Sequence, residues 1–534
     1  MRRTAVFLMM LTLSLLSYRD NGIGPPLHRI STIVLTAESV GIADATLRIH
    51  ITDTTGLKSF RLTRDRQAIL TTQYTGLDTT VTDTTLLRGR TYLYKAYRLQ
   101  DSVTIDSSDA LLVHTIDSAS IQINVEPLVT EAELQITIND RNPIRGFRIV
   151  RDGQTQFAGI LAGRDTTLFD TGLLPSSSHT YKVFRLDENI PIDSSASVPI
   201  MTLDTTNHDF TWQIDTIGAI TSTLNDVAMI NDNDIWAVGE IYGRDSAGQI
   251  ESQIYNLARW DGSQWKLSRI YYTYQGKQYL SPIISILAFD VNDIWIGSTQ
   301  PMHWNGSIWQ QFDITSTIFS GYIKKIWALS SNDVFIVGTN GSIAHFNGNV
   351  WQKMESGTDT DLLDIWGSPD GSVVWACGWV NAKPTVLLQM QQGVWKKIYE
   401  SESNLFIFDA DTLSGAIQSV WTDRKQRVFA LTWFNLYECP LASHGNGIIR
   451  RNDNNPYVWA SNRVRGTGIN NIAAVGAQGR IWHFNGTNWK QFDQLINPQD
   501  ELRSVVVNQG LIVAVGERYY NGIEYFGVVY RGSR

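Results

Sequence analysis

Several features that mark other protein classes are scarce in this chain of 534 residues. Only 18% of the residues are charged, the formal net charge is −8, and no run of Lys or Arg offers the basic surface that binds nucleic acid. GxSxG, HExxH, Walker and GxGxxG motifs are all missing. We therefore expect no catalytic residues, no metal ligands, no cofactor and no nucleic-acid partner.

Long apolar runs are also scarce. Residues 1–20, MRRTAVFLMMLTLSLLSYRD, combine two arginines with an apolar run from Ala5 to Leu16 that is too short to cross a bilayer. This pattern predicts an export signal and no membrane span in the mature chain, which places the protein in the periplasm, on the outer surface or outside the cell. The stretch LLSY resembles a bacterial lipobox, but Tyr18 stands where the lipidated Cys would be, so no lipid anchor is expected there.

Cysteine occurs only twice, at Cys377 and Cys439. An exported chain with two cysteines can form one disulfide or keep two separate buried thiols, and the sequence leaves both open.

Tryptophan is missing from the first 208 residues, whereas all 18 tryptophans follow. The early part repeats itself instead: FRLTRDRQ (Phe60–Gln67) returns as FRIVRDGQ (Phe147–Gln154), at an ungapped offset of 87 residues. Segments such as TLRIHIT and LQITIN alternate apolar and polar residues between turn-rich stretches. The pattern predicts two tandem antiparallel sandwiches of one fold.

The stretches LLRGRTYLYKAYRL (Leu86–Leu99) and LLPSSSHTYKVFRL (Leu173–Leu186) resemble the segment of fibronectin type III domains that leads into strand F. The resemblance implies immunoglobulin-like sandwiches at residues 28–115 and 116–204. It also implies that Tyr94 and Tyr181 are tyrosine corners.

From residue 209 onward a repeat of about 40 to 50 residues takes over, the range of propeller blades. One unit, KKIWALSSNDVFIVGTNGSIAHFNGNVWQKM (Lys324–Met354), predicts four short strands joined by tight turns. Asx-Gly pairs at Asp261, Asn305, Asn347 and Asn485 predict two-residue turns. The first strands of seven units are expected near Val227, Ile286, Ile326, Ile365, Val420, Val458 and Val505.

The seventh unit supplies only three strands, whereas DFTWQID (Asp209–Asp215) has the wording of a fourth strand and precedes the first unit. We therefore expect an all-β chain in which two sandwiches precede a seven-bladed β-propeller, residues 209–532, closed by this N-terminal strand. The unit pattern NDhWhVG…hhHFNG..W resembles bacterial exported propellers related to the photosystem assembly-factor-like and two-component-regulator-like propellers. This resemblance implies a fold without a particular chemistry.

Three histidines, His303, His345 and His483, occupy the same place in three units. Packed sheets lie about 10 Å apart, whereas zinc needs nitrogen ligands at about 2 Å. The repeat therefore indicates a packing role rather than a metal ring.

Loop length distinguishes the two faces expected for the propeller, because nearly all the long connections leave one of them. Long loops on a rigid scaffold commonly carry binding sites, and aromatic side chains with a polar tip suit protein and sugar surfaces. The candidate ligand-binding residues on this face are Tyr271, Tyr272, Tyr274, Tyr279, Trp379, Trp433, Tyr519 and Tyr520.

These observations favour an exported, non-catalytic binding protein whose propeller holds a protein or carbohydrate partner, with the sandwiches as spacers. One alternative is a carbohydrate-active enzyme, a glycoside hydrolase or lyase, using Asp409, Asp411 or Glu517 at the channel mouth. Another alternative is an assembly factor for an envelope complex.

Overall fold

The computed structural model describes residues 32–52, 59–73, 76–141, 143–381, 383–401, 413, 415–424, 427–433, 435–440, 461–520 and 524–534, without the side chains of residues 424, 439 and 440. The predicted export signal with Tyr18 lies outside the described residues, as do Asp409, Asp411 and Val458.

The chain divides into two compact units. The first comprises Met1–Gln122, Ile138–Phe147 and Phe184–Ser195, and the second comprises Ile123–Thr137, Arg148–Val183 and Ala196–Arg534. Among the described residues the structure is built from strands, with two short 3-10 helices, η1 (Thr339–Gly341) and η2 (Asp493–Leu495), and no α-helix.

The first part of the chain folds into two sheets that share one core. One sheet has the order β1-β2-β5, with strands β1 (Ile33–Val40), β2 (Ala45–Ile51) and β5 (Asp78–Asp83). The other has the order β4-β3-β6-β7, with β8 also paired to β6; its strands are β3 (Ser59–Arg64), β4 (Gln67–Gln73), β6 (Thr91–Gln100), β7 (Val103–Ser107) and β8 (Leu111–His114). Alternate residues of both sheets, such as Leu47, Ile49, Phe60 and Leu62, are buried together.

The following segment repeats this topology strand for strand. A three-stranded sheet has the order β13-β10-β9, with strands β9 (Ile121–Pro127), β10 (Glu131–Ile138) and β13 (Asp165–Thr171). The other sheet has the order β12-β11-β14-β15, with β16 paired to β14; its strands are β11 (Gly146–Arg151), β12 (Gln154–Ile160), β14 (Ser178–Asp187), β15 (Ile190–Ser194) and β16 (Val198–Met201).

Tyr94 and Tyr181, the predicted tyrosine corners, are both buried. In a tyrosine corner the hydroxyl donates to the backbone, whereas here it donates to a carboxylate. The Tyr94 hydroxyl donates to Asp83 Oδ2 at 2.7 Å, and Arg64 Nη1 donates to the same oxygen at 2.8 Å. The second copy repeats the arrangement at the offset of 87 residues, where the Tyr181 hydroxyl donates to Asp170 at 2.7 Å. A buried carboxylate replaces the backbone acceptor because a neighbouring arginine neutralises it.

After residue 210 the described strands form seven small antiparallel sheets, which we number 1 to 7, and one separate hairpin, β22 (Tyr272–Tyr274) with β23 (Lys277–Tyr279). Sheet 1 contains β18 (Thr223–Asn231), β19 (Asp234–Ile241), β20 (Tyr255–Trp260) and β21 (Trp265–Ser268). Sheet 2 contains β24 (Ser285–Asp290), β25 (Asp293–Gly297), β26 (Pro301–Trp304) and β27 (Trp309–Gln311). Sheet 3 contains β28 (Ile323–Ser330), β29 (Asp333–Gly338), β30 (Ile343–Phe346) and β31 (Trp351–Met354).

The remaining sheets continue the same meander. Sheet 4 contains β32 (Asp364–Gly367), β33 (Val374–Gly378), β34 (Thr385–Gln391) and β35 (Val394–Ser401). Sheet 5 contains β36 (Ile417–Arg424), β37 (Arg427–Thr432) and β38 (Leu436–Pro440). Sheet 6 contains β39 (Ser461–Gly468), β40 (Asn471–Gly476), β41 (Ile481–Phe484) and β42 (Trp489–Gln491). Sheet 7 contains β43 (Asp500–Val507), β44 (Leu511–Tyr520), β45 (Glu524–Ser533) and β17 (Thr211–Ile217).

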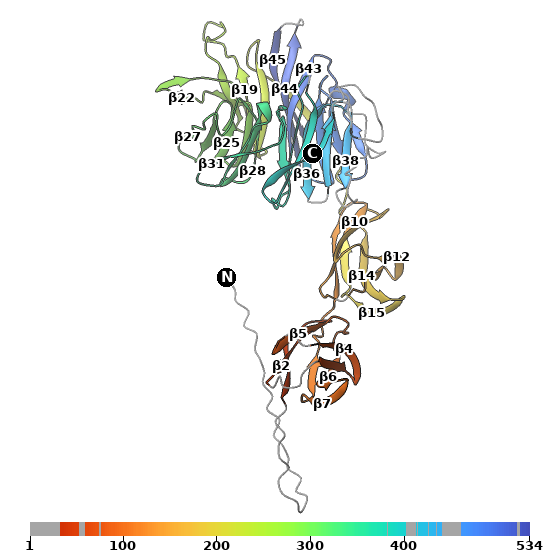
Figure 1. The fold of residues 1–534 in the computed structure, drawn as a ribbon. Helices are drawn as coiled ribbons and strands as arrows, with labels where there is room; N and C mark the ends of the chain where they lie inside the picture. The colour runs from red at the N-terminus through yellow and green to blue at the C-terminus, as the bar shows by residue number, and fades with distance from the viewer. Residues whose placement is uncertain are drawn as a thin grey trace, which may run out of the picture. The chain divides into compact units, whose positions relative to one another are not determined.

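Figure 1 shows the sheets after residue 210 gathered into one body. The first strands of consecutive sheets contact each other, and β43 of sheet 7 contacts β18 of sheet 1. This closed circle of first strands is the architecture of a β-propeller.

Sheet 7 joins the two ends of the domain. β17 pairs antiparallel with β45 from Thr211 opposite Ser533 to Ile217 opposite Gly527, and so occupies the outer position of that sheet. The Asp215 carboxylate accepts hydrogen bonds from Arg531 at 2.8 and 3.0 Å and from Trp265 Nε1 of sheet 1 at 3.0 Å. One side chain of β17 therefore bonds to the last sheet and to the first.

Two details differ from the sequence-based expectations. The Asx-Gly turns are four-residue loops, Asp261–Gln264 among them, in which the aspartate Oδ1 accepts the amides of Ser263 and Gln264 and only Gly262 has a positive φ, of 92°. An Asx side chain thus replaces the second left-handed residue that a two-residue turn needs. In sheet 6 the described strand β39 starts at Ser461, and Val464 holds the position that Val420 holds in sheet 5, whereas the predicted Val458 lies outside the described residues.

We predict that Asp215→Ala lowers the free energy of unfolding of the propeller by about 1–3 kcal/mol, because it leaves two partly buried donors without their acceptor. Thr211→Ala, an exposed position on the same strand, should change it by less than about 0.5 kcal/mol. Urea unfolding followed by tryptophan fluorescence reports on this domain alone, because every tryptophan follows residue 208. Equal stability of the two variants would contradict the role given to Asp215.

Candidate functional site

The two faces of the ring differ in the length of their connections. In a four-stranded meander the link between strands 2 and 3 and the link to the next sheet leave one face, which we call the long-loop face. Its described connections include residues 242–254, 269–284, 312–322 and 355–363. The opposite, short-turn face carries the turns at 232–233, 261–264, 291–292, 305–308, 331–332 and 347–350.

The most prominent element of the long-loop face is the β22–β23 hairpin, which projects from the ring in Figure 1. Tyr272 and Tyr279 stack across it with ring centres 5.6 Å apart, and Tyr274 meets Tyr279 edge-on. Tyr274 is 60% and Tyr279 41% exposed, and Tyr271, just before the hairpin, is 38% exposed. The hairpin therefore presents a tyrosine surface to solvent.

A side chain of sheet 2 holds this hairpin. Gln311 on β27 accepts the Thr273 amide at 2.8 Å and donates to the Thr273 carbonyl at 2.8 Å, as a neighbouring strand would. The long connection is therefore a positioned element rather than an irregular loop.

A second group lies in sheet 7, where β44 and β45 extend beyond the ring. Tyr519 contacts Tyr525 and Tyr520 contacts Phe526, with ring centres at 5.9 and 6.4 Å. The Tyr519 hydroxyl donates to Glu517 Oε1 at 2.7 Å, which raises the pKa of Tyr519 to about 12. Both tyrosines remain accessible at the surface.

A third group joins sheets 4 and 5. The indoles of Trp379 and Trp433 meet edge to face with ring centres 5.8 Å apart. With its side-chain oxygen turned toward them, the Gln418 amide accepts Trp433 Nε1 at 3.0 Å and Trp379 Nε1 at 2.5 Å. Both indoles are half-buried, so they form a polar-capped aromatic pair at the start of an inner strand.

The eight residues proposed from the sequence thus form three separate groups on one face. The described cavity beside the hairpin, lined by Tyr272 and Ile270, has a volume of only about 20 Å³. Such an arrangement offers a broad surface rather than a pocket.

Glu517 is the one channel-mouth carboxylate proposed from the sequence that the structure describes. Burial raises its pKa, but the charge of Arg503, whose Nη2 lies 2.8 Å from Glu517 Oε1, outweighs burial and leaves the pKa below its ordinary value. A general acid at neutral pH needs the opposite shift. Asp409 and Asp411 lie outside the described residues.

Below this face the channel is lined by one residue from each first strand, and we call this set the axial ring. Its members stand just before the apolar residue that opens the strand core: Asp226, Ser285, Lys325, Asp364, Ser419, Arg463 and Ser504. All are buried or nearly so.

Two carboxylates of the axial ring collect hydrogen bonds from neighbouring sheets. Asp226 accepts from Ser504 at 2.6 Å, Ser285 at 3.0 Å and Lys325 at 2.5 Å. Asp364 accepts from Ser419 at 2.5 Å and is paired with Arg463 at 2.7 Å.

The serine hydroxyls of the ring also accept from the sheet that follows. Ser285 Oγ accepts the Ile326 amide at 3.1 Å, and Ser419 Oγ accepts the Val464 amide at 3.2 Å. The axial ring therefore bonds sheets 7, 1, 2 and 3 to one another and, in a second group, sheets 4, 5 and 6.

Charge in the ring is nearly balanced. Arg465 lies two residues beyond Arg463 and donates to both oxygens of Asp364, at 2.6 and 2.9 Å. Burial alone would raise the pKa of Asp364, but the two guanidinium groups hold it well below its ordinary value. Burial lowers the pKa of Lys325 to about 8, because Asp226 only partly offsets the loss of water. Two carboxylates thus face three basic groups.

Sequence reasoning missed the axial ring, because its members share no residue type. The signal available was position: each precedes the apolar residue with which we aligned the first strands. Cys377 is a free buried thiol nearby, and burial together with the charge of Asp364 raises its pKa well above the ordinary value. The side chain of Cys439 lies outside the described residues.

A recurring contact lies on the short-turn side of five sheets. The first residue of the second strand contacts a residue of the third strand, namely the one that pairs with the third residue of the second strand. We call these two contacting residues the corner pair. His303 Nε2 lies 2.8 Å from Asp293 Oδ1, and His345 Nε2 lies 2.6 Å from Asp333 Oδ1. Each ring also stacks on the aromatic residue opposite, at 4.6 Å from Trp295 and 4.2 Å from Phe335. The repeated histidines therefore pair within their own sheets, as the packing interpretation expected. The five described pairs are Asp234/Arg259, Asp293/His303, Asp333/His345, Arg427/Glu438 and Asn471/His483.

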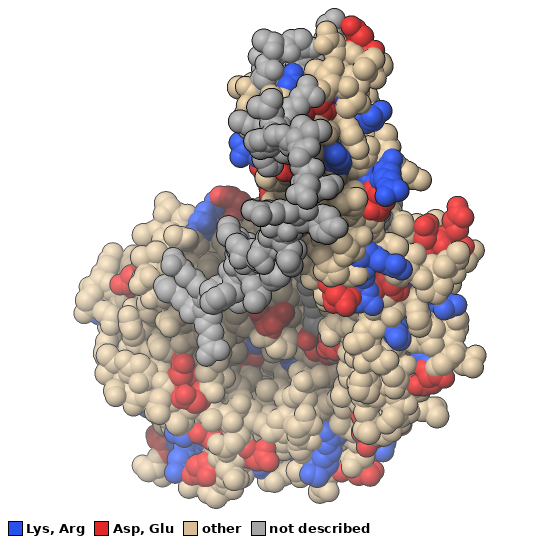
Figure 2. Space-filling view, turned by 90° about the horizontal axis from the view of Figure 1, so that it is seen from below, with Lys and Arg blue, Asp and Glu red and all other residues tan. Residues whose placement is uncertain are grey.

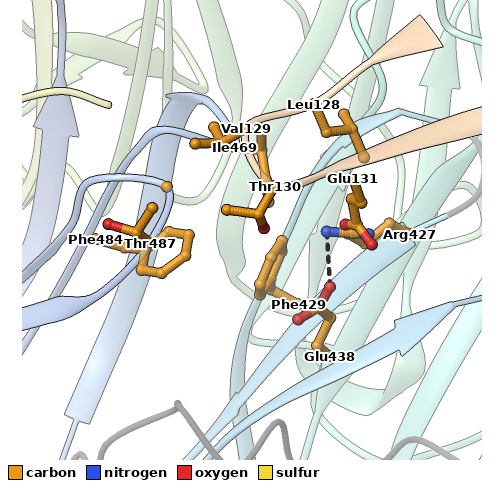
Figure 3. A pocket seen from close by; sticks show the side chains of 11 residues that line it. Leu128, Val129, Thr130, Glu131, Arg427, Phe429, Glu438, Ile469, Phe484 and Thr487 are labelled. Atoms are coloured by element: carbon orange, nitrogen blue, oxygen red, sulfur yellow. Dashed lines mark hydrogen bonds and ion pairs between the residues drawn. The ribbon is translucent and has the colours of Figure 1, made fainter. Parts of the chain in front are cut away.

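Sheets 5 and 6 receive residues from outside the ring, all within the second compact unit. Figure 3 shows Arg427 between Glu131 and Glu438. Leu128 and Val129 are buried against an apolar cluster that includes Phe429. The turn leaves a cavity of about 140 Å³.

The segment before β17 is fixed beside this turn. His208 Nδ1 lies 2.8 Å from His483 Nδ1, and the Thr206 amide donates to the Asn485 carbonyl at 3.1 Å. Burial, together with the charges of His208 and Arg534, lowers the pKa of His483 to about 3. His483 is therefore neutral at physiological pH. In the neutral ring one nitrogen donates and the other accepts. Because Nε2 of His483 donates to Asn471 Oδ1, its Nδ1 accepts the hydrogen bond from His208.

The chain shows only distant similarity to known proteins. No family model and no curated protein matches the sequence. Among solved structures, the chain is similar to "YCF48 bound to D1 peptide" (15% identity, 62% of this chain and 97% of that chain, TM-score 0.43). It is also similar to YCF48 from Cyanidioschyzon merolae (12%, 60% and 98%, TM-score 0.41) and Sqt1 from Chaetomium thermophilum (10%, 61% and 100%, TM-score 0.40). These neighbours are β-propeller proteins, and at such low similarity their partners carry no argument about this chain.

Two further features are absent from the described residues. No group of three or more His, Cys, Asp or Glu side chains is placed to hold a metal ion. No helix in the same residues is long and apolar enough to cross a membrane.

The axial ring predicts a pH dependence of stability. Because the pKa of Lys325 is about 8 in the fold and about 10.5 in the unfolded chain, the unfolded chain binds more protons between these values, and stability rises with pH. From pH 8 to 9.5 the rise should be about 1–2 kcal/mol. It should be absent in Lys325→Met and retained in Lys324→Met, as measured by urea unfolding with tryptophan fluorescence. A rise that persists in Lys325→Met would contradict this assignment.

The hairpin predicts a local effect. Gln311→Ala removes both bonds to Thr273, so the Thr273 amide should exchange with solvent at least about tenfold faster, with little change in global stability. Gln310→Ala, the exposed neighbour, is the matched control. Unchanged exchange in Gln311→Ala would mean that other contacts hold the hairpin.

Proposed function

We propose that this chain is a non-catalytic binding protein whose propeller holds a protein partner on its long-loop face. The observation that carries the proposal is the set of exposed tyrosines at positions 271, 274, 279, 519 and 520, all on connections or strand ends of that one face. Tyrosine supplies a large contact area with a polar tip at a low entropic cost, which suits protein interfaces.

A protein is favoured over a glycan by the shape of the surface. The tyrosines stand in three groups, and the 20 Å³ cavity beside the hairpin is too small for a sugar ring. The enzymatic alternative has no positive support, because Glu517 is paired and ionised.

The proposal includes a domain layout. Residues 209–532 form a seven-bladed propeller closed by the strand that precedes its first blade, and residues 28–115 and 116–204 are fibronectin type III-like sandwiches. The sandwiches act as spacers for an exported protein. The repeated β1-β2-β5 and β4-β3-β6-β7 topology supports this layout.

The test is partner capture by the full chain. The triple variant Tyr274→Ser, Tyr279→Ser and Tyr520→Ser should lose at least about 90% of a captured protein, because tyrosines at the centre of an interface commonly each contribute 1 kcal/mol or more. Ile308→Ser, an exposed apolar change on the short-turn face, should retain it. A glycan array measured alongside should give no signal that the triple variant abolishes. Retained protein capture by the triple variant, or a glycan signal that depends on these tyrosines, would overturn the proposal.

A further inference from the structure

The turn that docks on sheet 5 occupies a groove that the fold repeats. The groove between sheets 5 and 6 is lined by Arg427, Phe429 and Glu438 on one side and by Phe484 and the turn after it on the other. The groove between sheets 3 and 4 is lined by Asp333, Phe335 and His345, which hold the same strand positions, and by the corresponding turn of sheet 4.

The two grooves differ in what fills them. Between sheets 5 and 6 the chain's own turn, Leu128–Val129–Thr130–Glu131, leaves a cavity of about 140 Å³. Between sheets 3 and 4 the cavity measures about 560 Å³. The glycines in the turns that line the two grooves differ in the same way. A methyl group on Gly486, in the groove between sheets 5 and 6, would meet Val129 Cγ2 at 2.6 Å. One on Gly393, in the groove between sheets 3 and 4, would meet nothing within 4 Å.

The corner pairs of the two grooves carry opposite charge where a ligand approaches. In sheet 5 the opening residue is Arg427, and it binds the carboxylate of Glu131. In sheet 3 the opening residue is Asp333, whose side chain is 39% exposed. Lys353 and Glu355 in the same groove pair with each other at 2.7 Å and offset each other's charge, so Asp333, which contacts the His345 ring, adds one further acidic group to the groove.

The walls of the sheet 3–4 groove suit a peptide. Met354, Met390 and Val394 line it, and Val394 is largely exposed. Across the face drawn in Figure 2, acidic and basic residues are interspersed rather than gathered by sign, so local pairs decide which ligand charge is accepted.

We propose that the groove between sheets 3 and 4 is a second docking site, which binds a surface turn of a partner protein with two apolar residues followed, one residue later, by Lys or Arg. The apolar pair takes the place that Leu128 and Val129 take on sheets 5 and 6, and the basic side chain meets Asp333. This site is on the short-turn side and is independent of the long-loop face.

The chain itself provides the probe. Residues 126–133 read EPLVTEAE, and the peptide with Glu131→Lys places a basic group at the position that would face Asp333. Its isomer with Glu126→Lys has the same composition and net charge but keeps the acidic group there. Both are labelled and titrated with the full-length protein by fluorescence anisotropy.

We expect the Glu131→Lys peptide to bind about tenfold more tightly than its isomer at low salt, the size of effect that one complementary charge pair at an interface produces. The preference should shrink at 0.5 M NaCl. Val394→Lys, an exposed change on the groove wall, should abolish the preference.

A charge swap tests the assignment to this groove. Asp333→Arg combined with His345→Glu installs the sheet 5 pair in sheet 3 and should reverse the preference toward the isomer, whereas the same exchange in sheet 2, Asp293→Arg with His303→Glu, should leave it unchanged. Equal binding of the two peptides to the wild-type protein would overturn the proposal, as would a preference that survives both the swap and Val394→Lys. Self-association of the full chain that the sheet 3 swap abolishes would assign the groove to a second copy and also overturn it.

Discussion

Closure of the ring is the constraint on which the propeller depends. The first strands meet around one axis, and β43 must reach β18 for the circle to close. Two sets of contacts act at this seam: β17 completes sheet 7 at the rim, and Asp226 of sheet 1 accepts from Ser504 of sheet 7 at the axis. Because buried carboxylates are costly unless fully bonded, the serines, lysine and arginines of the axial ring make the circle specific as well as closed.

The two faces of the closed ring carry different kinds of contact. On the short-turn side, the corner pairs of sheets 1 to 3 open with an aspartate, whereas those of sheets 5 and 6 open with Arg427 and Asn471. Sheets 5 and 6 are the two that receive Glu131 and His208. The long-loop face carries the aromatic groups, each held by a polar partner such as Gln311, Gln418 or Glu517. The contacts with Glu131 and His208 and the three aromatic groups therefore lie at opposite ends of the same strands.

What the sequence predicted and what it missed follow one physical distinction. Contacts within a sheet recur as the same short sequence in each unit, so the hairpins and the fourth-strand character of the segment around Trp212 could be recognised. The repeated histidines were recognised as packing residues, but their partners Asp293 and Asp333 were not predicted. Contacts between sheets join different residue types, so the Asp, Ser, Lys and Arg residues of the axial ring do not form a recurring sequence motif. The docking residues Glu131 and His208 were missed for the same reason, because each bonds to a residue more than 270 positions away. Tyr271, Tyr274 and Tyr279 were predicted from loop length alone, but only the backbone bonds of Gln311 explain why that loop is a hairpin.

The central claim is that the long-loop face is the recognition surface. It is tested most directly by hydrogen-exchange footprinting of the full-length protein with and without a captured partner. The account predicts that protection appears in residues 271–279 and 517–520 and is absent from the short turns at 261–264 and 305–308. Protection confined to those short turns, with 271–279 and 517–520 unchanged, would contradict it.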